Sequence, residues 1–253
     1  DGCPYRGHGF VPDEIVEGAE VFVLMQNPSV NEVKGRKFDG YNGPQETWED
    51  HPPAPAIGKT GYYQDAKLFP LAGLVRGENV SIGNAIRCLG PTSTGQLPSL
   101  SDSTLLQAIR HCHQAHFQPP NSTKLLVATG EYALWALTRE GEKDVEDEKE
   151  SRRSLSQWRG WVLPQSDRPL VHTSVYTPRL EVPVLCTYHT ASLFRVPKNT
   201  PVVRQDWAKI PRILAGEWPQ SLPSIVPDSP LHWPATCAFD TEFAANGFLL
   251  RHS

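Results

Sequence analysis

The chain has 253 residues, of which 39% are hydrophobic and 21% charged, with 24 Lys+Arg against 28 Asp+Glu. This length and composition suit one globular domain with a short extra segment, and they exclude a fibre or a largely disordered chain. The longest apolar runs, such as Val21–Met25, are far shorter than the roughly 18 residues of a membrane-spanning helix. We therefore expect no membrane partner.

The cysteines and the start of the sequence bear on the compartment. The five cysteines are widely and irregularly spaced, unlike those of a small secreted disulfide scaffold. No signal-peptide pattern opens the sequence. We expect an intracellular, cytoplasmic protein of bacterial or phage-like origin, with free or metal-bound thiols.

Charge is unevenly distributed along the chain. Residues 151–215 contain ten basic and three acidic residues, a net charge of +7, which leaves −11 for the remainder of a chain whose net charge is −4. Phosphate binding depends on local potential, so a basic face on an acidic protein is compatible with a polyanion such as DNA. A solvated surface would have the same composition.

Four short, buried-type apolar runs predict the strands of one sheet. They are Val21–Met25, Val80–Gly83, Leu125–Ala128 and Val184–Thr187. Helices are predicted between and after them, over Tyr62–Leu74, Ser103–Phe117, Glu131–Leu137, Ser192–Phe194 and Gln205–Leu214. Alternation of strands and helices indicates an α/β fold with a mainly parallel four-stranded sheet covered on both faces.

Polar residues follow each predicted strand. They are Gln26-Asn27-Pro28, Asn84, Thr129-Gly130 and Tyr188-His189. Ligands of open α/β sheets bind beyond the carboxyl ends of the strands, so these groups predict a site at one edge of the sheet. Asn, Gly and Pro are also ordinary loop residues, which is the alternative reading of each position alone.

The remaining segments indicate insertions and domain boundaries. Residues 43–60 are predicted to be a Pro-rich loop, and residues 141–154 a solvated charge run. A Pro-rich linker is predicted over 218–234, between a main domain of residues 1–217 and a further segment of residues 235–253.

Taken in order, the strand-end motifs resemble those of the uracil-DNA glycosylase superfamily, most closely its iron–sulfur family 4 and 5 enzymes. The matching segments are Met25-Gln26-Asn27-Pro28-Ser29, Gly35-Arg36-Lys37-Phe38-Asp39-Gly40, Gly58-Lys59-Thr60-Gly61, Ile82–Pro91, Trp158-Arg159-Gly160, Thr187–Arg195 and Asp206–Ile210. Coverage runs from Cys3 to about Leu214. The resemblance implies a three-layer α/β/α sandwich that excises uracil from DNA and leaves an abasic site.

The resemblance also implies roles for individual residues. Asn84 would pair with the edge of a flipped uracil, and Phe38 would stack on its face. His189 would donate a hydrogen bond to the uracil oxygen as negative charge develops there. Ser192 and Arg195, in the segment that follows, would contact DNA.

The water-positioning motif departs from the nearest relatives. The iron–sulfur families have Glu where this chain has Gln26, and Asn27 stands where the best-known uracil glycosylases have Asp. An amide orients a water molecule but does not act as a general base at neutral pH. We expect Asn27 to position the water with support from Gln26, and a slow enzyme. The stacking ring is also open, because the inserted loop could supply Trp48, Tyr62 or Tyr63 in place of Phe38.

Three cysteines resemble ligands of the family's [4Fe-4S] cluster. They are Cys3, Cys88 and Cys112, and the fourth ligand would fall upstream of Asp1. His111, His113 and His116 beside Cys112 leave zinc open as the alternative, and free thiols without a metal are the third reading. Cys186, inside a predicted strand, is expected to be buried packing.

The last segment resembles the first motif of DnaQ-like 3′-5′ exonucleases. There an Asp-x-Glu pair, here Asp240 and Glu242, lies on one face of a strand and binds Mg²⁺. We interpret the chain as the N-terminal part of a glycosylase–exonuclease fusion, with a polymerase as a further candidate domain.

Three functions remain open at this stage. The first is a repair enzyme that acts on uracil-containing DNA. The second is a catalytically weak uracil-sensing or DNA-binding module that serves an attached exonuclease or polymerase. The third is a related α/β nucleotide-binding domain without a DNA role.

Overall fold

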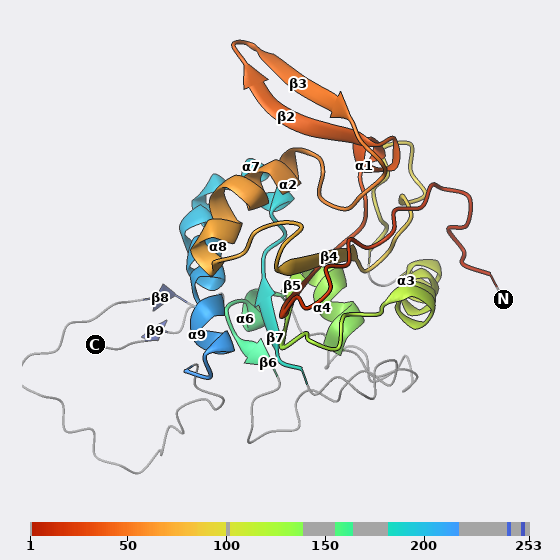
Figure 1. Ribbon diagram of the computed structural model, residues 1–253. Helices are drawn as coiled ribbons and strands as arrows, with labels where there is room; N and C mark the ends of the chain where they lie inside the picture. Colours follow the sequence, from red (N-terminus) through yellow and green to blue (C-terminus); the bar gives the residue numbers. More distant parts are fainter. Residues whose placement is uncertain are drawn as a thin grey trace, which may run out of the picture.

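The computed structural model describes residues 2–99, 102–138, 155–163 and 182–217, together with the dipeptides 242–243 and 249–250. The predicted charge run, the whole of the predicted linker and Asp240 lie outside these residues. Figure 1 gives the arrangement of the elements. No helix of the described part is long and apolar enough to span a bilayer.

The central sheet has five strands, in the order β4-β1-β5-β7-β6. The strands are β1 (Val21–Met25), β4 (Val80–Asn84), β5 (Leu125–Thr129), β6 (Val162–Leu163) and β7 (Val184–Thr187). The four predicted strands are present and parallel to one another. The prediction of only four strands was wrong, because the two-residue β6 adds an antiparallel edge to β7. Two residues are too few for a periodic pattern to indicate a strand.

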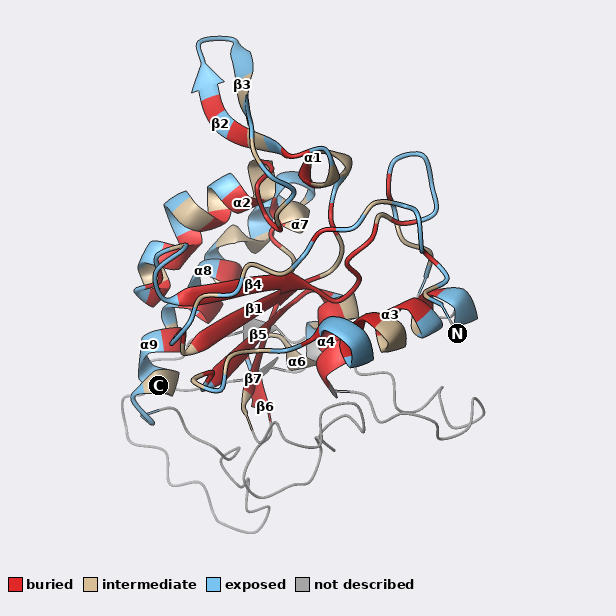
Figure 2. Ribbon diagram, turned by 45° about the vertical axis from the view of Figure 1, so that its right-hand side comes forward, coloured by how far each residue is buried: buried red, intermediate tan, exposed pale blue. Residues whose placement is uncertain are grey.

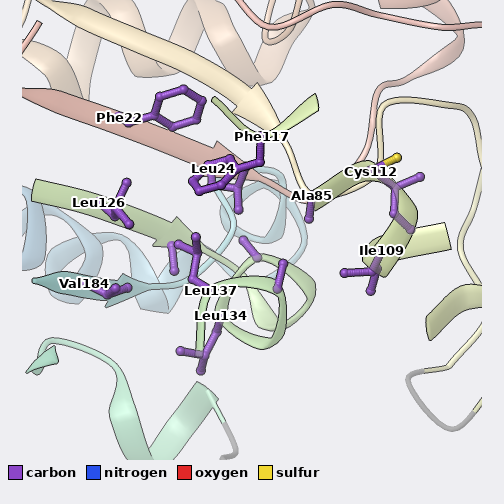
Figure 3. Close-up of a cluster of buried hydrophobic side chains, with 14 of the residues drawn as sticks. Phe22, Leu24, Ala85, Ile109, Cys112, Phe117, Leu126, Leu134, Leu137 and Val184 are labelled. Atoms are coloured by element: carbon purple, nitrogen blue, oxygen red, sulfur yellow. The ribbon is translucent and has the colours of Figure 1, made fainter. Parts of the chain in front are cut away.

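Both faces of the sheet are buried, which explains why its strands are continuous apolar runs without polar alternation. Phe22 and Leu24 of β1 point into one cluster with Leu126 of β5, while Val21 and Val23 point into another. The strands are buried throughout their length (Figure 2). Figure 3 shows the first cluster, in which side chains of the sheet and of two helices meet.

The helices cover these two clusters. On the first lie α3 (Ser103–His116) and α4 (Glu131–Thr138). On the second lie the π-helix η1 (Gln64–Leu68), the 3-10 helix η2 (Phe69–Ala72), α8 (Thr200–Ala208) and α9 (Ile210–Leu214). The shorter elements are α1 (Val30–Val33), α2 (Lys59–Tyr63), α6 (Leu155–Trp158), α7 (Ala191–Arg195) and η3 (Pro197–Asn199).

A β-hairpin stands away from the sheet (Figure 1) and was not predicted. Strands β2 (Arg36–Asn42) and β3 (Gln45–Asp50) pair antiparallel, with Phe38 opposite Trp48 and a bulge between Phe38 and Gly40. Residues 45–50 had been assigned to a Pro-rich loop. The prolines lie outside the strands, so the composition of the whole segment concealed a strand of mainly polar residues.

The far end of the chain contributes one small described element. Strands β8 (Glu242–Phe243) and β9 (Leu249–Leu250) pair antiparallel. The expected metal-binding carboxylate Glu242 therefore lies on a strand, whereas its partner Asp240 is outside the described residues.

Candidate functional site

A pocket of about 840 Å³ lies at the carboxyl end of β1. Its walls come from six segments: the end of β1 with α1, the start of α2, the hairpin, the loop of residues 94–97, Tyr132 of α4, and His189 with α7. Because β4, β1, β5 and β7 are parallel to one another, their carboxyl ends meet at the same edge of the sheet. The pocket therefore occupies the edge at which the sequence predicted a site.

Asn27 is held in one orientation by two backbone carbonyls. Its Nδ2 donates to the Pro28 carbonyl at 3.0 Å and to the Gly95 carbonyl at 2.9 Å. Both N–H groups of the amide are thereby engaged, so Oδ1 is the atom that remains to accept a hydrogen bond. No described residue donates to it. Such an acceptor on the pocket wall suits a water molecule that donates a hydrogen bond to it.

His189 is a neutral hydrogen-bond donor in this site. Burial, with a smaller contribution from Arg195, lowers the pKa of the imidazole to about 4. The Ala191 N–H donates to Nδ1 at 3.3 Å, so the neutral ring carries its proton on Nε2. His189 lines the pocket, and it can donate from Nε2 without the charge of an imidazolium.

Asn84 is the buried polar side chain of the neighbouring strand. It ends β4 with 1% of its surface exposed, and neither Oδ1 nor Nδ2 has a hydrogen-bond partner among the described residues. It pairs in register with Met25, which lines the pocket. The two residues that follow Asn84 donate their backbone N–H groups to the carbonyls of Met25 and Gln26. An unpaired buried amide is costly, so this position favours a ligand that offers both a donor and an acceptor.

Gly130 brings three strand ends into close approach. Its φ is +98°, and an added Cβ would lie 2.3 Å from Nε2 of Gln26 and 3.0 Å from Cβ of His189. Only a residue without a side chain fits between these two groups. Gln26 and the segment that carries His189 thus approach each other closely at Gly130.

Neither the models of known protein families nor the curated proteins match this chain. Function is therefore inferred from the geometry and chemistry of the site itself.

Phe38 does not line the pocket. The ring is 2% exposed and is enclosed edge-on by Tyr41, Trp48 and Tyr62, at centroid distances of 5.1–5.3 Å. Trp48 does line the pocket. The hairpin therefore brings a half-buried indole to the pocket wall and uses Phe38 as the centre of the ring cluster behind it.

The two predicted DNA-contacting residues lie on α7, which follows His189. Arg195 is exposed and lines the pocket. Ser192 has a buried Oγ without a partner among the described residues, while its N–H donates to the His189 carbonyl at 2.8 Å. Phe194 also lines the pocket, is 53% exposed and packs edge-on against Tyr63.

A carboxylate that sequence reasoning missed also reaches the pocket. Glu32, 6% exposed, forms a capping box with Ser29 at the start of α1. Burial raises its pKa, and the N–H groups of Ser29 and Ala56 oppose that shift. The signal was present as Ser29-x-x-Glu32, a pattern that by itself indicates a helix start and not a site.

A buried ionic network fixes the strand that carries His189. Asp206 is fully buried and receives hydrogen bonds from Thr187 at 3.0 Å, Arg159 at 3.1 Å and Lys209 at 3.4 Å. Thr187 ends β7, two residues before His189, and the Arg159 guanidinium lies 5.9 Å from the Tyr188 ring centroid. The network therefore holds both the last strand residue and the residue next to the imidazole.

A second hollow, of about 650 Å³, gathers the predicted metal ligands. Cys3, Cys88 and Cys112 all line it, together with His111 and His116. Burial raises the pKa of the Cys88 thiol to about 11, with further contributions from Cys112 and from a hydrogen bond with Cys3. The backbone N–H of Arg87 donates to Sγ of Cys112 at 3.5 Å.

Cys186 and His113 do not line the second hollow. His113 stacks on Phe117 in the core, with a centroid distance of 4.7 Å, and Cys186 is fully buried in β7 as expected. Among the described residues, no three Cys, His or acidic side chains are close enough together to hold a single metal ion.

The structure brings most of the predicted site residues into two places. Gln26, Asn27, His189 and Arg195 line the pocket, Asn84 lies beside it, and the three cysteines share the second hollow. Phe38 and Ser192 line neither. The loop of residues 94–97 and the indole of Trp48 have no local pattern that identifies them as pocket residues.

Proposed function

We propose that this chain is a uracil-DNA glycosylase that hydrolyses the N-glycosidic bond of deoxyuridine in DNA, built on the three-layer α/β/α sandwich of that superfamily. The observation that carries the proposal is the amide of Asn84, buried beside the pocket with an unused donor and an unused acceptor. The edge of uracil offers an acceptor at O4 beside a donor at N3. A flipped uracil would therefore satisfy both atoms of the amide.

The order of the strands supports one ligand between Asn84 and His189. The two residues end β4 and follow β7, which are three strands apart, or roughly 14 Å across the sheet edge. Met25 and Gln26 lie between them on β1. A planar base held by Asn84 on one edge would have its opposite oxygen directed toward His189.

The chemical roles follow from the atoms that remain available. Nε2–H of neutral His189 would donate to O2 of uracil, where negative charge develops as the bond to C1′ of the sugar breaks. Oδ1 of Asn27 would accept a hydrogen bond from the water that attacks C1′. The water releases its second proton to solvent, and the uracil anion leaves and is protonated there. Arg195 would contact a DNA phosphate at the pocket mouth.

The alternative function is a uracil-sensing module with little turnover. It is favoured by the water side of the pocket, where Gln26 and Asn27 replace carboxylates with amides that do not take a proton. Such a module would bind uracil-containing DNA through Asn84 and leave the glycosidic bond intact.

The test is a cleavage assay with single- and double-stranded oligonucleotides that carry one uracil, followed by alkaline scission of abasic sites. We expect a product with the wild-type chain and a rate lower by about 10²–10³-fold for His189→Ala. His51→Ala is the matched control, because that half-buried ring lies outside the pocket lining and, among the described residues, bonds to the Pro52 carbonyl. Binding without product would support the sensing module, and neither binding nor product would overturn both proposals.

Asn84→Asp tests the recognition step separately. The carboxylate keeps the size of the amide but loses its two N–H donors, so O4 of uracil would meet a second acceptor. We expect weaker binding of uracil-containing DNA, while binding of undamaged DNA stays unchanged. An equal loss of affinity for uracil-containing and undamaged DNA would argue against contact between Asn84 and the base.

We further propose that Cys3, Cys88 and Cys112 are ligands of a [4Fe-4S] cluster. The proposal is supported by three thiols that line one hollow and by a hydrogen bond from the Arg87 N–H to Sγ of Cys112. When bound, the group would supply cross-links between the N-terminal segment, the residues after β4, and α3. Asp240 and Glu242 remain the proposed Mg²⁺ ligands of an exonuclease-like segment that serves the same DNA.

A further inference from the structure

Exposed aromatic side chains border the pocket on two sides. Tyr41 of the hairpin is 68% exposed, Tyr62 of α2 is 45% exposed, and Phe194 of α7 is also exposed. Exposed apolar groups that gather at one place commonly mark a binding surface. The roles proposed for the glycosylase reaction use none of these three rings.

One face of the hairpin carries its aromatic side chains. Phe38 lies opposite Trp48, and Tyr41 lies opposite Glu46. Directly opposite residues share a face, and Trp48 and Glu46 both line the pocket. Phe38 and Tyr41 are three positions apart, a spacing that regular alternation would send to opposite faces. The bulge between Phe38 and Gly40 brings Tyr41 to the side that faces the pocket.

Helix α2 continues this face toward α7, and both helices lie at the foot of the hairpin (Figures 1 and 2). The Tyr62 ring packs edge-on against Phe38 at a centroid distance of 5.3 Å, and the Tyr63 ring packs edge-on against Phe194 at 5.8 Å. Two successive residues of α2 thus contact the hairpin and α7. We call the rings that run from the hairpin to α7 the aromatic band, which consists of Tyr41, Trp48, Tyr62, Tyr63 and Phe194.

Three cations lie along the aromatic band. Nζ of Lys59 is 6.0 Å from the Tyr41 ring centroid, and the guanidinium of Arg36 is 5.9 Å from that of Trp48. Arg195 lines the pocket at the α7 end. Stacking rings with cations beside them are typical of surfaces that bind an unpaired nucleic-acid strand.

We infer that the aromatic band binds the unpaired DNA strand next to the uracil, so that the preferred substrate is single-stranded DNA. In a duplex only the flipped base leaves the stack, whereas neighbouring bases of an unpaired strand are free to stack on protein rings. The choice of DNA rests on the proposed function, because the band is continuous with the pocket that would hold the flipped base. The inference adds the class of substrate, which that function leaves open.

The experiment measures binding of uracil-free DNA to the full chain, so it does not depend on base excision. Fluorescence anisotropy compares a labelled strand of about twelve thymidines with a duplex of the same length. We expect the single strand to bind at least about tenfold more tightly. Since Lys59 is already paired with Glu46, few phosphates would be neutralised, and the slope of log K against log salt should be only about −1.

Tyr41→Leu and Phe194→Leu each remove a stacking ring and keep an apolar side chain. Each should weaken binding of the single strand by about tenfold, whereas Tyr41→Phe keeps the ring and should bind as the wild-type chain does. Phe10→Leu is the matched control, because Phe10 is a similarly exposed ring that lines the second hollow, and it should leave binding unchanged. Thermal melting of each variant checks the fold.

Equal or tighter binding of the duplex overturns the inference, and so does full affinity of Tyr41→Leu and Phe194→Leu for the single strand. Binding of neither form of DNA also overturns it and would leave the aromatic band as a contact for another protein. The uracil cleavage assay is read separately. Strand binding without cleavage contradicts only the glycosylase proposal, and cleavage without preference for the single strand contradicts only this inference.

Discussion

The pocket and the cysteine hollow differ in how their polar groups are held. In the pocket, Asn27, His189 and Gly130 are positioned by backbone atoms and by close packing at the edge of a regular sheet. In the hollow, Cys3 comes from an N-terminal segment without helix or strand, and it meets Cys88 and Cys112 only through folding of the whole domain. The first region is therefore organised by the fold itself, while the proposed cluster would add cross-links to the second.

The largest expected difference concerns the buried ion pair beside each region. Arg87 is 1% exposed and pairs with Asp13 next to the hollow, whereas Arg159 and Lys209, which pair with Asp206 near the pocket, have side chains 23% and 25% exposed. Asp13→Ala leaves a buried guanidinium without a carboxylate, and we expect it to cost about 3–5 kcal/mol of unfolding free energy.

Asp206→Ala should cost less, about 2 kcal/mol, because the two cations can reach water. Urea denaturation of both variants measures the difference, with Glu20→Ala, which breaks the exposed pair with Lys124, as the control. Equal costs for Asp13→Ala and Asp206→Ala would contradict this view of the two regions.

Gly130→Ala tests whether close packing organises the pocket. The new Cβ would collide with Gln26 and His189, and the positive φ adds strain, so we expect a loss of about 1–3 kcal/mol in stability. Glycosylase activity should fall by about 100-fold, in line with displaced catalytic groups. Gly73→Ala is the control, because Gly73 has φ +65° with open space around it and lies at the end of η2. We expect Gly73→Ala to lower the stability of the protein and to leave its activity unchanged.

The pH dependence should show that His189 acts in its neutral form. Its pKa of about 4 predicts that kcat/KM stays flat as the pH falls from 8 to about 5 and declines only toward 4. An imidazole that had to be protonated would instead give a rate that rises below about pH 6.5. A pH–rate profile with saturating and limiting substrate distinguishes the two cases.

The lowered pKa of His189 also predicts how the unfolding free energy changes with pH. The folded pKa of His189 lies below the unfolded value of 6.5, so the unfolded state binds more protons between about pH 6.5 and 4. The stabilising effect is complete above pH 6.5 and is lost as the pH falls through this window. His189→Asn should make the fall in unfolding free energy shallower there, and an unchanged slope would show that the imidazole is protonated equally in both states.

The smallest expected effect is that of the ion pair at the pocket mouth. Lys59 and Glu46 join α2 to the hairpin, but both side chains are about 40% exposed. We expect Glu46→Gln to change stability by less than about 0.5 kcal/mol. Phe38→Leu, which removes the centre of the ring cluster, should cost more, about 1–2 kcal/mol. Thermal melts of the two variants compare them, and a larger cost for Glu46→Gln would mean that charge and not aromatic packing holds the hairpin.

The sheet could be predicted from the sequence because burial of both faces leaves each parallel strand as one apolar run. The four predicted strands are present, and β1 and β7 have the predicted ends. The helix over Tyr62–Leu74 was found as α2, η1 and η2, since a π-helical turn followed by Pro70 interrupts α-helical geometry.

Most of the predicted site residues near the pocket follow strands, and Arg195 on α7 is the exception. Gln26, Asn27, Asn84 and His189 were predicted from strand ends. The partner of Asn27, the carbonyl of Gly95, is 68 residues away in a loop, and Trp48 lies on a strand of mainly polar residues. Such contacts depend on how loops fold back over the sheet, and single-sequence patterns carry no information about that. Likewise the sequence offered three histidines beside Cys112, and only the orientation of α3 separates His113 from the other two.

The base of the hairpin is closed by one short link. The His51 N–H donates to the Gly35 carbonyl at 2.8 Å, and Gly35 has φ +65° with the His51 carbonyl oxygen too near to admit a side chain. The two ends of residues 36–50 are therefore fixed next to each other whatever lies between them. This makes the hairpin an exchangeable module: its length and sequence can be rewritten, by evolution or by protein engineering, without moving the strands below. Since the same module supplies Trp48, the shape of the pocket can change while the sheet stays constant.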